Sequence, residues 1–482
     1  MSDTTPHHSL MIVGATATDV QKQVFAPYDR SVIASVDTAN GEAVEAALTA
    51  AYRTFRSRDS WLSKPRRIEI LSKAAEIMTD QVEQLTLDAA REGGKPLIDS
   101  RIEVVRAISS VEACVEELKH ATGEIIPMNV NAASANRFAA TTLEPIGVVV
   151  AVSAFNHPLN LIAHQVAPAV ATGCPVIVKP SEDTPLSCIR FVEILREAGL
   201  PEEFCQVTVT ETRDVATALV TDPRVAFFSF IGSPGVGWSL RSQLAPGTRC
   251  ALEHGGAAPV IVGADANLAE IVPPLVKGGM YHAGQVCVSV QRVFAHESIA
   301  RSLAEAMADA AEKLIVGDPT RADTEVGPLI RPREVERVHE WTTEAVDRGA
   351  EVLAGGEPMD HNCYRPTVLY DPPDDVRVSQ QEVFGPVVCV YPYDDMDEAI
   401  ERANALPFAF QAAVFTKDID RAMRAYSRLD ASAVMINDHT AFRVDWMPFA
   451  GLRQSGLGVG GISHTMQDMQ IQKMMVLRSP EL

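Results

Sequence analysis

The chain alternates short runs of apolar residues with longer stretches in which apolar residues recur at helical spacing. Between residues 146 and 256, helical patterns at 159–171 and 184–198 separate runs rich in β-branched and aromatic residues: GVVVAVSAF, PVIVKP, FCQVTV, RVAFFSFIG and ALEHGG. Strands that alternate with helices at this spacing are typical of a parallel sheet covered on both faces. We therefore predict a doubly wound α/β unit, with any ligand bound beyond the carboxyl ends of its strands.

A second series of the same kind follows. Helical patterns at 268–281, 299–314 and 397–405 lie among the runs PVIVG, QRVFAH, EVFGPVVCVYPY, QAAVFT and SAVMIN. This series predicts a second α/β unit. Before it, residues 1–50 are expected to form mostly an irregular segment with one helix, and residues 64–121 a helical region that packs on the first sheet.

Two segments fit neither sheet, residues 131–145 and residues 467–478. Both alternate polar and apolar residues and are expected to form an edge ribbon. Since exposed apolar strands are usually paired or covered, we expect the subunits to associate through this ribbon.

Length and charge narrow the class of protein. A chain of 482 residues is long enough for two or three co-folding units. The formal charge of −21, from 63 acidic and 42 basic side chains, disfavours nucleic acid as a partner but leaves room for a local cationic pocket. No apolar run is long enough for a membrane helix, and the opening residues lack the pattern of a secretory signal, so we expect a cytoplasmic protein without a membrane partner.

The cysteines give one candidate for chemistry. Eight are spread along the chain without the spacing of a zinc site, so no metal is expected. Cys287 follows Gly284 in G-Q-V-C, after a helical stretch, and a glycine here allows a turn that could expose the thiol. By itself this pattern fits an inert cysteine at a helix end equally well.

Two polar residues could work with Cys287. Glu253 in L-E-H-G-G ends a predicted strand, where its carboxylate could face a cleft as a base. Asn156 in F-N-H-P-L lies between a strand and a helix, where its amide could point at a developing oxyanion. The alternatives are a solvated carboxylate for Glu253 and a helix cap for Asn156.

A dinucleotide could bind beyond the neighbouring strands. In V-K-P-S-E, Lys179 and Glu182 could meet ribose hydroxyls or a phosphate. In G-S-P-G-V-G, small residues between a strand and a helix could let the backbone approach a pyrophosphate: Gly232, Ser233 and Gly237. The spacing is not G-x-G-x-x-G, so a plain tight turn stays open.

Seven motifs, taken together and in this order, closely resemble the aldehyde dehydrogenase family over nearly the whole chain. They are N-H-P-L, V-K-P-S-E, G-S-P-G-V-G, L-E-H-G-G, G-Q-V-C, E-V-F-G-P and P-F-A-G-L-R-Q-S-G-L-G. The resemblance implies an NAD-binding domain (1–125 and 146–254), a catalytic domain (255–460), and a small β element (126–145 and 461–482) that joins subunits into homodimers or tetramers. It implies that an aldehyde is oxidised to a free acid.

The resemblance also assigns roles to residues. Cys287 is the nucleophile, Glu253 the base, and Asn156 with the Cys287 backbone N–H the oxyanion hole. The dinucleotide is expected at Lys179, Glu182, Gly232, Ser233, Gly237, Glu382 and Phe384. Glu182 would repel a 2′-phosphate and favours NAD, although Lys179 nearby leaves NADP open.

The departures from the family pattern bear on the substrate. His157 stands where an aromatic residue is usual, and His254 where leucine is usual. Arg443, in F-R-V-D-W, and Arg106, in a predicted helix, could face the substrate tunnel with His157. Guanidinium groups bind phosphonate, sulfonate and carboxylate oxygens, so we expect a short anionic aldehyde.

Within the family, F-R-V-D-W-M-P-F-A-G most resembles members that act on phosphonoacetaldehyde. Because Val286 places no charge beside the nucleophile, sulfoacetaldehyde, sulfolactaldehyde, succinate semialdehyde and lactaldehyde remain alternatives. Two readings from other classes also remain: a Cys–His hydrolase using His282, and a catalytically silent relative that serves as a structural protein.

Overall fold

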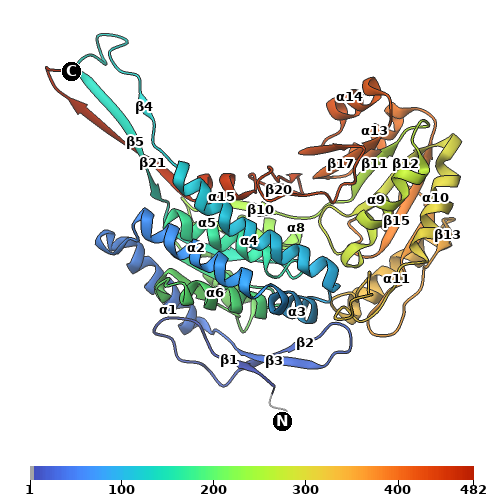
Figure 1. The fold of residues 1–482 in the computed structure, drawn as a ribbon, viewed down its shortest axis with the longest axis horizontal. Helices are drawn as coiled ribbons and strands as arrows, with labels where there is room; N and C mark the ends of the chain where they lie inside the picture. Colours follow the sequence, from blue (N-terminus) through green and yellow to red (C-terminus); the bar gives the residue numbers. More distant parts are fainter. Residues whose placement is uncertain (1–4) are drawn as a thin grey trace.

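The computed structural model describes residues 5–482, so the first four residues of the predicted opening segment and of the first predicted domain lie outside it. Two sheets form the centres of two lobes (Figure 1). The first sheet has the order β20-β10-β9-β6-β7-β8, and all its strands are parallel except β20. Its strands are β6 (Val148–Val152), β7 (Val176–Lys179), β8 (Cys205–Val207), β9 (Val225–Ile231), β10 (Arg249–Glu253) and β20 (Gly456–Leu457). The predicted doubly wound unit is confirmed.

Helices cover both faces of this sheet because its side chains alternate between two cores. Val148 and Val150 share one core with α1 (Gly41–Arg56) and α7 (Arg213–Thr221), whereas Val149 and Ala151 share the other with α5 (Asn160–Thr172) and α6 (Leu186–Glu197). α8 (Pro234–Arg241) follows β9 on the first of these faces. The helical region predicted at 64–121 is present as α2 (Lys64–Asp80), α3 (Val82–Gly93) and α4 (Leu97–His120). It forms an outer layer on α5 and α6.

The prediction for the first 50 residues is wrong in one respect. β1 (His7–His8), β2 (Gln21–Phe25) and β3 (Val32–Asp37) form a small three-stranded sheet before α1. No local pattern indicates this sheet, because β2, QKQVF, is mostly polar and only one of its side chains is buried.

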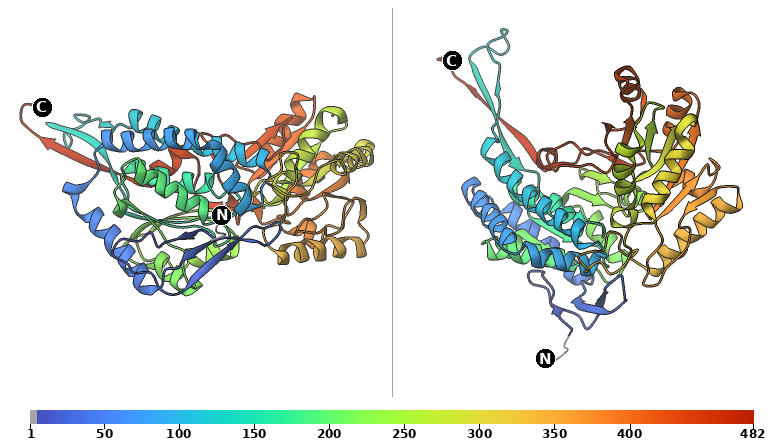
Figure 2. Two further views of the ribbon diagram at one scale, coloured as in Figure 1. Left: turned by 60° about the horizontal axis from the view of Figure 1, so that its bottom comes forward. Right: turned by 45° about the vertical axis from the view of Figure 1, so that its right-hand side comes forward.

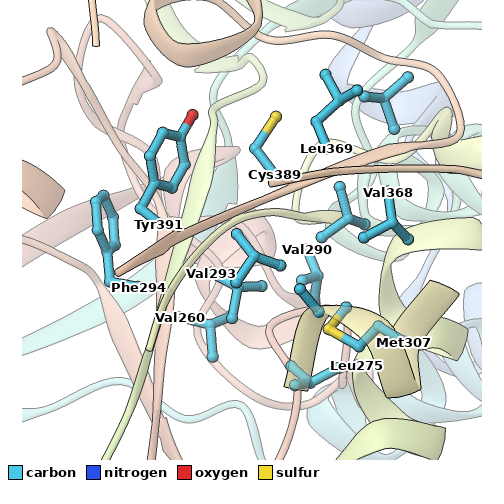
Figure 3. Close-up of a cluster of buried hydrophobic side chains, with 14 of the residues drawn as sticks. Val260, Leu275, Val290, Val293, Phe294, Met307, Val368, Leu369, Cys389 and Tyr391 are labelled. Carbon is cyan, nitrogen blue, oxygen red and sulfur yellow. The ribbon is translucent and has the colours of Figure 1, made fainter. Parts of the chain in front are cut away.

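The second lobe contains a seven-stranded sheet of order β13-β14-β15-β12-β11-β17-β18, parallel except for β13. Its strands are β11 (Ala258–Val262), β12 (Val290–His296), β13 (Glu351–Ala354), β14 (Thr367–Tyr370), β15 (Val387–Tyr393), β17 (Gln411–Phe415) and β18 (Ala433–Ile436). Its helices are α9 (Leu268–Met280), α10 (Glu297–Ala311), α11 (Pro332–Asp347), α12 (Arg377–Gln380), α13 (Met396–Asn404) and α14 (Ile419–Arg428). Figure 3 shows its core, where Leu275 and Met307 lie close to Val290 from the sheet. The second predicted α/β unit is therefore confirmed.

The two segments that fit neither sheet pair with each other. β5 (Arg137–Pro145) and β21 (Gln470–Arg478) form a long antiparallel ribbon that extends away from the first lobe, with β4 (Ile125–Ile126) on its other edge (Figure 2). Within residues 5–482, no helix is both long enough and apolar enough to cross a membrane.

The chain returns to the first lobe before it enters the ribbon. β19 (Leu452–Arg453) pairs with β16 (Phe408–Ala409), β20 then joins the first sheet beside β10, and α15 (Ile462–Asp468) packs on α4 and α5. The boundary expected between 460 and 461 therefore does not coincide with this return, because residues 456–468 pack with the first lobe.

Candidate active site

A cavity of about 620 Å³ lies between the lobes, beyond the carboxyl ends of β6, β7, β9 and β10. All of the expected site residues except Gly237 line it: Arg106, Asn156, His157, Lys179, Glu182, Gly232, Ser233, Glu253, Cys287, Glu382, Phe384 and Arg443. Residues more than 300 positions apart in the sequence thus meet in one site, at the edge where parallel sheets bind ligands.

The loop that carries Cys287 has an unusual backbone. His282 and Ala283 have φ values of 51° and 52°, in the left-handed region that side chains rarely adopt, and Gly284 has φ of +67°. A Cβ at Gly284 would overlap the carbonyl oxygen of Gly385 in E-V-F-G-P. The glycine therefore allows these two loops to pack together beside the nucleophile.

Gln285 fixes this loop in place. Its side-chain amide donates to the carbonyl oxygens of His282 and Pro328, both at 3.2 Å, and its side-chain oxygen accepts from Ile330 N at 3.0 Å. Asn156 Nδ2 donates to the Gln285 carbonyl oxygen at 2.9 Å. Since an amide nitrogen carries two hydrogens, one remains for an oxyanion. The sequence reasoning missed Gln285, although a polar side chain between Gly284 and an apolar run was a possible signal.

Cys287 lies in an apolar pocket formed by Val286, Val288, Phe410 and Phe449. Burial, followed by the nearby carboxylates of Glu382 and Glu253, raises the pKa of its thiol to about 12. The resting thiol is therefore protonated at neutral pH and needs a base before it can attack.

Glu253, at the end of β10, borders the same cavity and is the base that the sequence suggested. Burial raises the pKa of its carboxyl group. The following residues are tied down by Ser455, whose hydroxyl donates to the Gly255 carbonyl at 2.9 Å and whose carbonyl accepts from His254 N at 2.9 Å. The strand end that carries Glu253 is thereby held in position.

Glu382 lies against the backbone of Gly255, where a Cβ would overlap its carboxyl group. Burial raises its pKa to about 8, and its Oε1 has no hydrogen-bond partner among residues 5–482. A buried polar atom without a partner is costly, and Glu382 lines the cavity.

Two residues expected at the dinucleotide also make contacts that were not expected. Glu182 lines the cavity, and its Oε2 forms an ion pair with Lys22 Nζ at 2.8 Å. Gly237 does not line the cavity, and a Cβ there would overlap the ring of His254. The absence of a side chain at Gly237 thus makes room for His254.

The remaining residues of this region fit a dinucleotide. Gly232 and Ser233 precede α8, whose free N–H groups can bind a pyrophosphate, and Lys179 ends β7 beside the cavity. Glu382 Oε1, which has no hydrogen-bond partner within residues 5–482, could accept a hydrogen bond from the nicotinamide end of the dinucleotide.

The three expected substrate residues have different surroundings. Arg443 has its guanidinium 3.5 Å from the centre of the Phe449 ring, and its Nη1 is buried without a hydrogen-bond partner among residues 5–482. Burial lowers its pKa to about 10, so it remains a cation at neutral pH. His157 Nε2 is 2.8 Å from the Tyr281 hydroxyl, and burial lowers its pKa well below the usual value.

Arg106 borders the cavity, but two of its guanidinium nitrogens already donate hydrogen bonds to a carboxylate. Its Nε and Nη2 donate to Asp445 at 3.0 and 2.7 Å, so it cannot hold a substrate anion with the same two groups. The bidentate substrate contact expected of Arg106 is therefore corrected. Asp445 also contacts His164 Nε2 at 2.7 Å. The sequence reasoning named neither Asp445 nor His164, because nothing local marks them.

Comparison with known proteins decides the family. Residues 15–475 match the model of the aldehyde dehydrogenase family. The chain belongs to this family. It is 36% identical over 471 residues to 3-sulfolactaldehyde dehydrogenase of Priestia megaterium, which covers 98% of each chain.

Two solved structures of the family are closely similar. Aldehyde dehydrogenase 21 from Physcomitrella patens, in complex with the reaction product succinate, has a TM-score of 0.94 at 32% identity and covers 98% of this chain and 99% of that one. Glyceraldehyde-3-phosphate dehydrogenase from Methanocaldococcus jannaschii, complexed with NADP, has a TM-score of 0.91 at 32% identity and covers 96% and 100%. The expected aldehyde dehydrogenase fold is confirmed.

The chain is therefore an oxidoreductase of the NAD(P)-dependent aldehyde dehydrogenase type. This excludes the Cys–His hydrolase, which the geometry also disfavours. Both ring nitrogens of His282 lack a hydrogen-bond partner in the described part of the chain, so this histidine does not activate Cys287. The same family assignment excludes the hypothesis of a catalytically silent structural relative, because it identifies the chain as an enzyme.

Proposed function

We propose that this enzyme oxidises a short aldehyde bearing an anionic group to the carboxylic acid, with NAD(P) as the oxidant. The observation that carries the proposal is the convergence of Cys287, Asn156 and Glu253 with the cation of Arg443 in one cavity. The first three residues supply a nucleophile, an oxyanion donor and a base. Arg443 supplies a binding partner for a negative charge.

The residues of the cavity account for the chemical steps. Glu253 takes the thiol proton, and the Cys287 thiolate attacks the aldehyde carbon to give a thiohemiacetal. The free amide hydrogen of Asn156 and the Cys287 backbone N–H donate to the oxyanion. A bound dinucleotide would accept the hydride, which leaves a thioester on Cys287. Glu253 releases the thiol proton to solvent and then deprotonates a water, whose oxygen bonds to the acyl carbon while the C–S bond breaks and the thiolate is regenerated.

The dinucleotide would be held by Lys179, Gly232 and Ser233, with Glu382 and Phe384 on its nicotinamide side. The carboxylate of Glu182 disfavours a 2′-phosphate, which supports NAD. Its ion pair with Lys22 weakens this repulsion, so NADP should also bind. A comparison of the two cofactors in wild type and a Lys22→Ala variant tests this, because loss of Lys22 should reduce NADP use more than NAD use.

Several aldehydes fit the proposed class. Phosphonoacetaldehyde was favoured by the sequence, whereas the similar proteins act on 3-sulfolactaldehyde or were solved with succinate. A panel of test substrates is completed by sulfoacetaldehyde, succinate semialdehyde and lactaldehyde. These aldehydes differ in the head group but share the reacting carbonyl.

The test is kcat/KM over this panel and acetaldehyde, with both cofactors. Anionic aldehydes should be preferred, and Arg443→Gln should reduce kcat/KM for them about 100-fold while changing acetaldehyde much less, as expected for loss of a charge-assisted contact. The matched control is Arg333→Gln, since Arg333 lies on the surface at the start of α11. Equal loss for anionic and neutral aldehydes in Arg443→Gln would exclude the anion site.

We also propose that subunits associate through the β5–β21 ribbon, as a homodimer or tetramer. Nearly every side chain of β21 is exposed although many are apolar: Ile471, Met474, Met475, Val476 and Leu477. A long exposed apolar ribbon is unusual on a monomer and is commonly covered by another subunit.

A further inference from the structure

We infer that the substrate end of the cavity, lined by Arg106, His157 and Arg443, selects a head group with a single negative charge, because Asp445 neutralises Arg106 whereas Arg443 forms no ion pair within residues 5–482. This inference rests on the proposed oxidation of an anionic aldehyde. It assigns Asp445, which the sequence analysis did not single out, as the specificity-determining residue.

The Arg106–Asp445 pair is a complete bidentate contact. Nε and Nη2 of Arg106 bond to the two carboxylate oxygens of Asp445, whose side chain is only 3% exposed. Such a fork-to-carboxylate contact satisfies both groups and cancels their charges locally. Arg106 therefore shapes the cavity without adding net positive charge to it.

Asp445 is itself fixed from three sides. His164 Nε2 on α5 lies 2.7 Å from Oδ1, and Asn160 Nδ2 on the same helix donates to that oxygen at 3.3 Å. Arg106 approaches from α4. Because burial lowers the pKa of His164, this imidazole is neutral near pH 7 and leaves the charge balance unchanged. A change of rotamer at Asp445 would break contacts to two helices at once, so the neutralised arrangement is stable.

Arg443 forms no ion pair within residues 5–482, although the nearby carboxyl group of Glu253 opposes the lowering of its pKa by burial. Its guanidinium stacks on Phe449 and its buried Nη1 is unsatisfied within residues 5–482. Arg443 lines the cavity, and a guanidinium there with an unsatisfied donor is a binding group for an anion.

The other titratable groups near Arg443 and Cys287 do not supply a second cation to the substrate end. Burial keeps His157 neutral and Tyr281 and the Cys287 thiol protonated. Glu253 and Glu382 can only add negative charge, and burial raises the pKa of both carboxyl groups. At neutral pH the substrate end therefore carries at most one uncompensated positive charge.

This balance separates the candidate head groups. A sulfonate or a carboxylate has one negative charge, which Arg443 can neutralise. A phosphonate loses its second proton near neutral pH, as phosphate esters do. Its second charge would be buried next to Asp445 without a partner, which is unfavourable. The inference therefore opposes phosphonoacetaldehyde, the substrate favoured from the sequence, and supports a sulfonated or carboxylated aldehyde.

Sulfoacetaldehyde and phosphonoacetaldehyde make a matched pair, because they share one carbon framework and differ in the head group. We expect the ratio of kcat/KM for the sulfonate to that for the phosphonate to exceed one and to rise about tenfold between about pH 6 and about pH 8. Effects of pH on Cys287 and Glu253 cancel in this ratio, because both substrates react through the same groups.

Two charge variants should move the ratio in opposite directions. Asp445→Asn frees the charge of Arg106 and should lower the ratio about tenfold, whereas Arg106→Gln exposes the charge of Asp445 and should raise it about tenfold. The double variant restores the balance and should return the ratio close to that of wild type. Competitive inhibition by sulfoacetate and phosphonoacetate gives the same comparison for binding alone, and the melting temperature checks that each variant is folded.

The outcomes are distinguishable. A folded Asp445→Asn enzyme with an unchanged ratio for both turnover and inhibition would overturn the inference, as would a wild type that prefers phosphonoacetaldehyde at alkaline pH. Failure of the proposed function looks different: acetaldehyde would then be oxidised as well as both anions, and Arg443→Gln would leave all three unchanged.

Discussion

Replacing Glu103 by Gln should destabilise the protein by about 3–5 kcal/mol, the usual cost of leaving one partner of a buried ion pair alone. Lys95 Nζ lies 2.5 Å from Glu103 Oε2, and both side chains are only 1% exposed. The other carboxylate oxygen accepts from the backbone N–H groups of Leu159 and Asn160, at 2.9 and 3.1 Å. Gln preserves the volume but has a single acceptor oxygen, so it must leave either Lys95 or the start of α5 unsatisfied.

The pH dependence of the free energy of unfolding provides a second, independent test of the Glu103→Gln variant. Burial lowers the pKa of Lys95 below its ordinary value of 10.5 even with Glu103 present, and removing Glu103 should lower it further. In the variant, the unfolded chain then binds more protons than the folded one at pH values between the folded and unfolded pKa. Stability should therefore rise with pH in that window, by up to about 1.4 kcal/mol per pH unit, and the deficit should shrink towards pH 10.5.

Urea unfolding at equal protein concentration measures this loss, with Lys95→Met/Glu103→Gln as the control. The double variant removes the stranded charge and should recover most of the stability. Because Glu103 holds the start of α5, directly after Asn156 and His157, kcat should also fall in the single variant. A loss below about 1 kcal/mol, or a double variant no more stable than Glu103→Gln, would refute the reasoning.

Three further predictions follow from the site. Glu382→Gln should speed alkylation of Cys287 by iodoacetamide above about pH 8, where the wild-type carboxylate ionises and opposes the thiolate, and should have little effect below it; the rate as a function of pH checks this. Gly237→Ala should cost about 1–3 kcal/mol in urea unfolding, because the added methyl overlaps the His254 ring, and His254→Ala in the same chain should recover part of the loss. Met474→Glu on β21 should shift the protein to a smaller species in size-exclusion chromatography; an unchanged elution volume would exclude this ribbon as the interface.

The sequence predicted the parts of the fold and site that depend on local patterns. Both parallel sheets follow from runs of β-branched residues separated by helical stretches, and Asn156 and Glu253 were recognisable because each comes at the end of such a run. Cys287 was recognisable from the glycine before it, which the structure shows in the left-handed region. In each case the signal lies within a few residues of the group concerned.

Features that depend on distant contacts were not predictable. Arg106 was expected to meet the substrate, but its partner Asp445 is 339 positions away and no local pattern links them. Gly237 was expected at the dinucleotide, and no local pattern indicated that its missing side chain makes room for the His254 ring. Local patterns therefore identify the groups of a site more reliably than the contacts that set their charge.

The charge of the whole chain and the charge of the cavity act over different ranges. With a formal charge of −21, the surface should repel an anionic aldehyde at a distance. At physiological salt, however, surface charges are screened beyond about 8 Å, while a buried guanidinium such as Arg443 is screened far less. Capture of the anion is thus decided by the few charges inside the cavity, and a single carboxylate such as Asp445 can set specificity there although more than sixty acidic residues elsewhere do not.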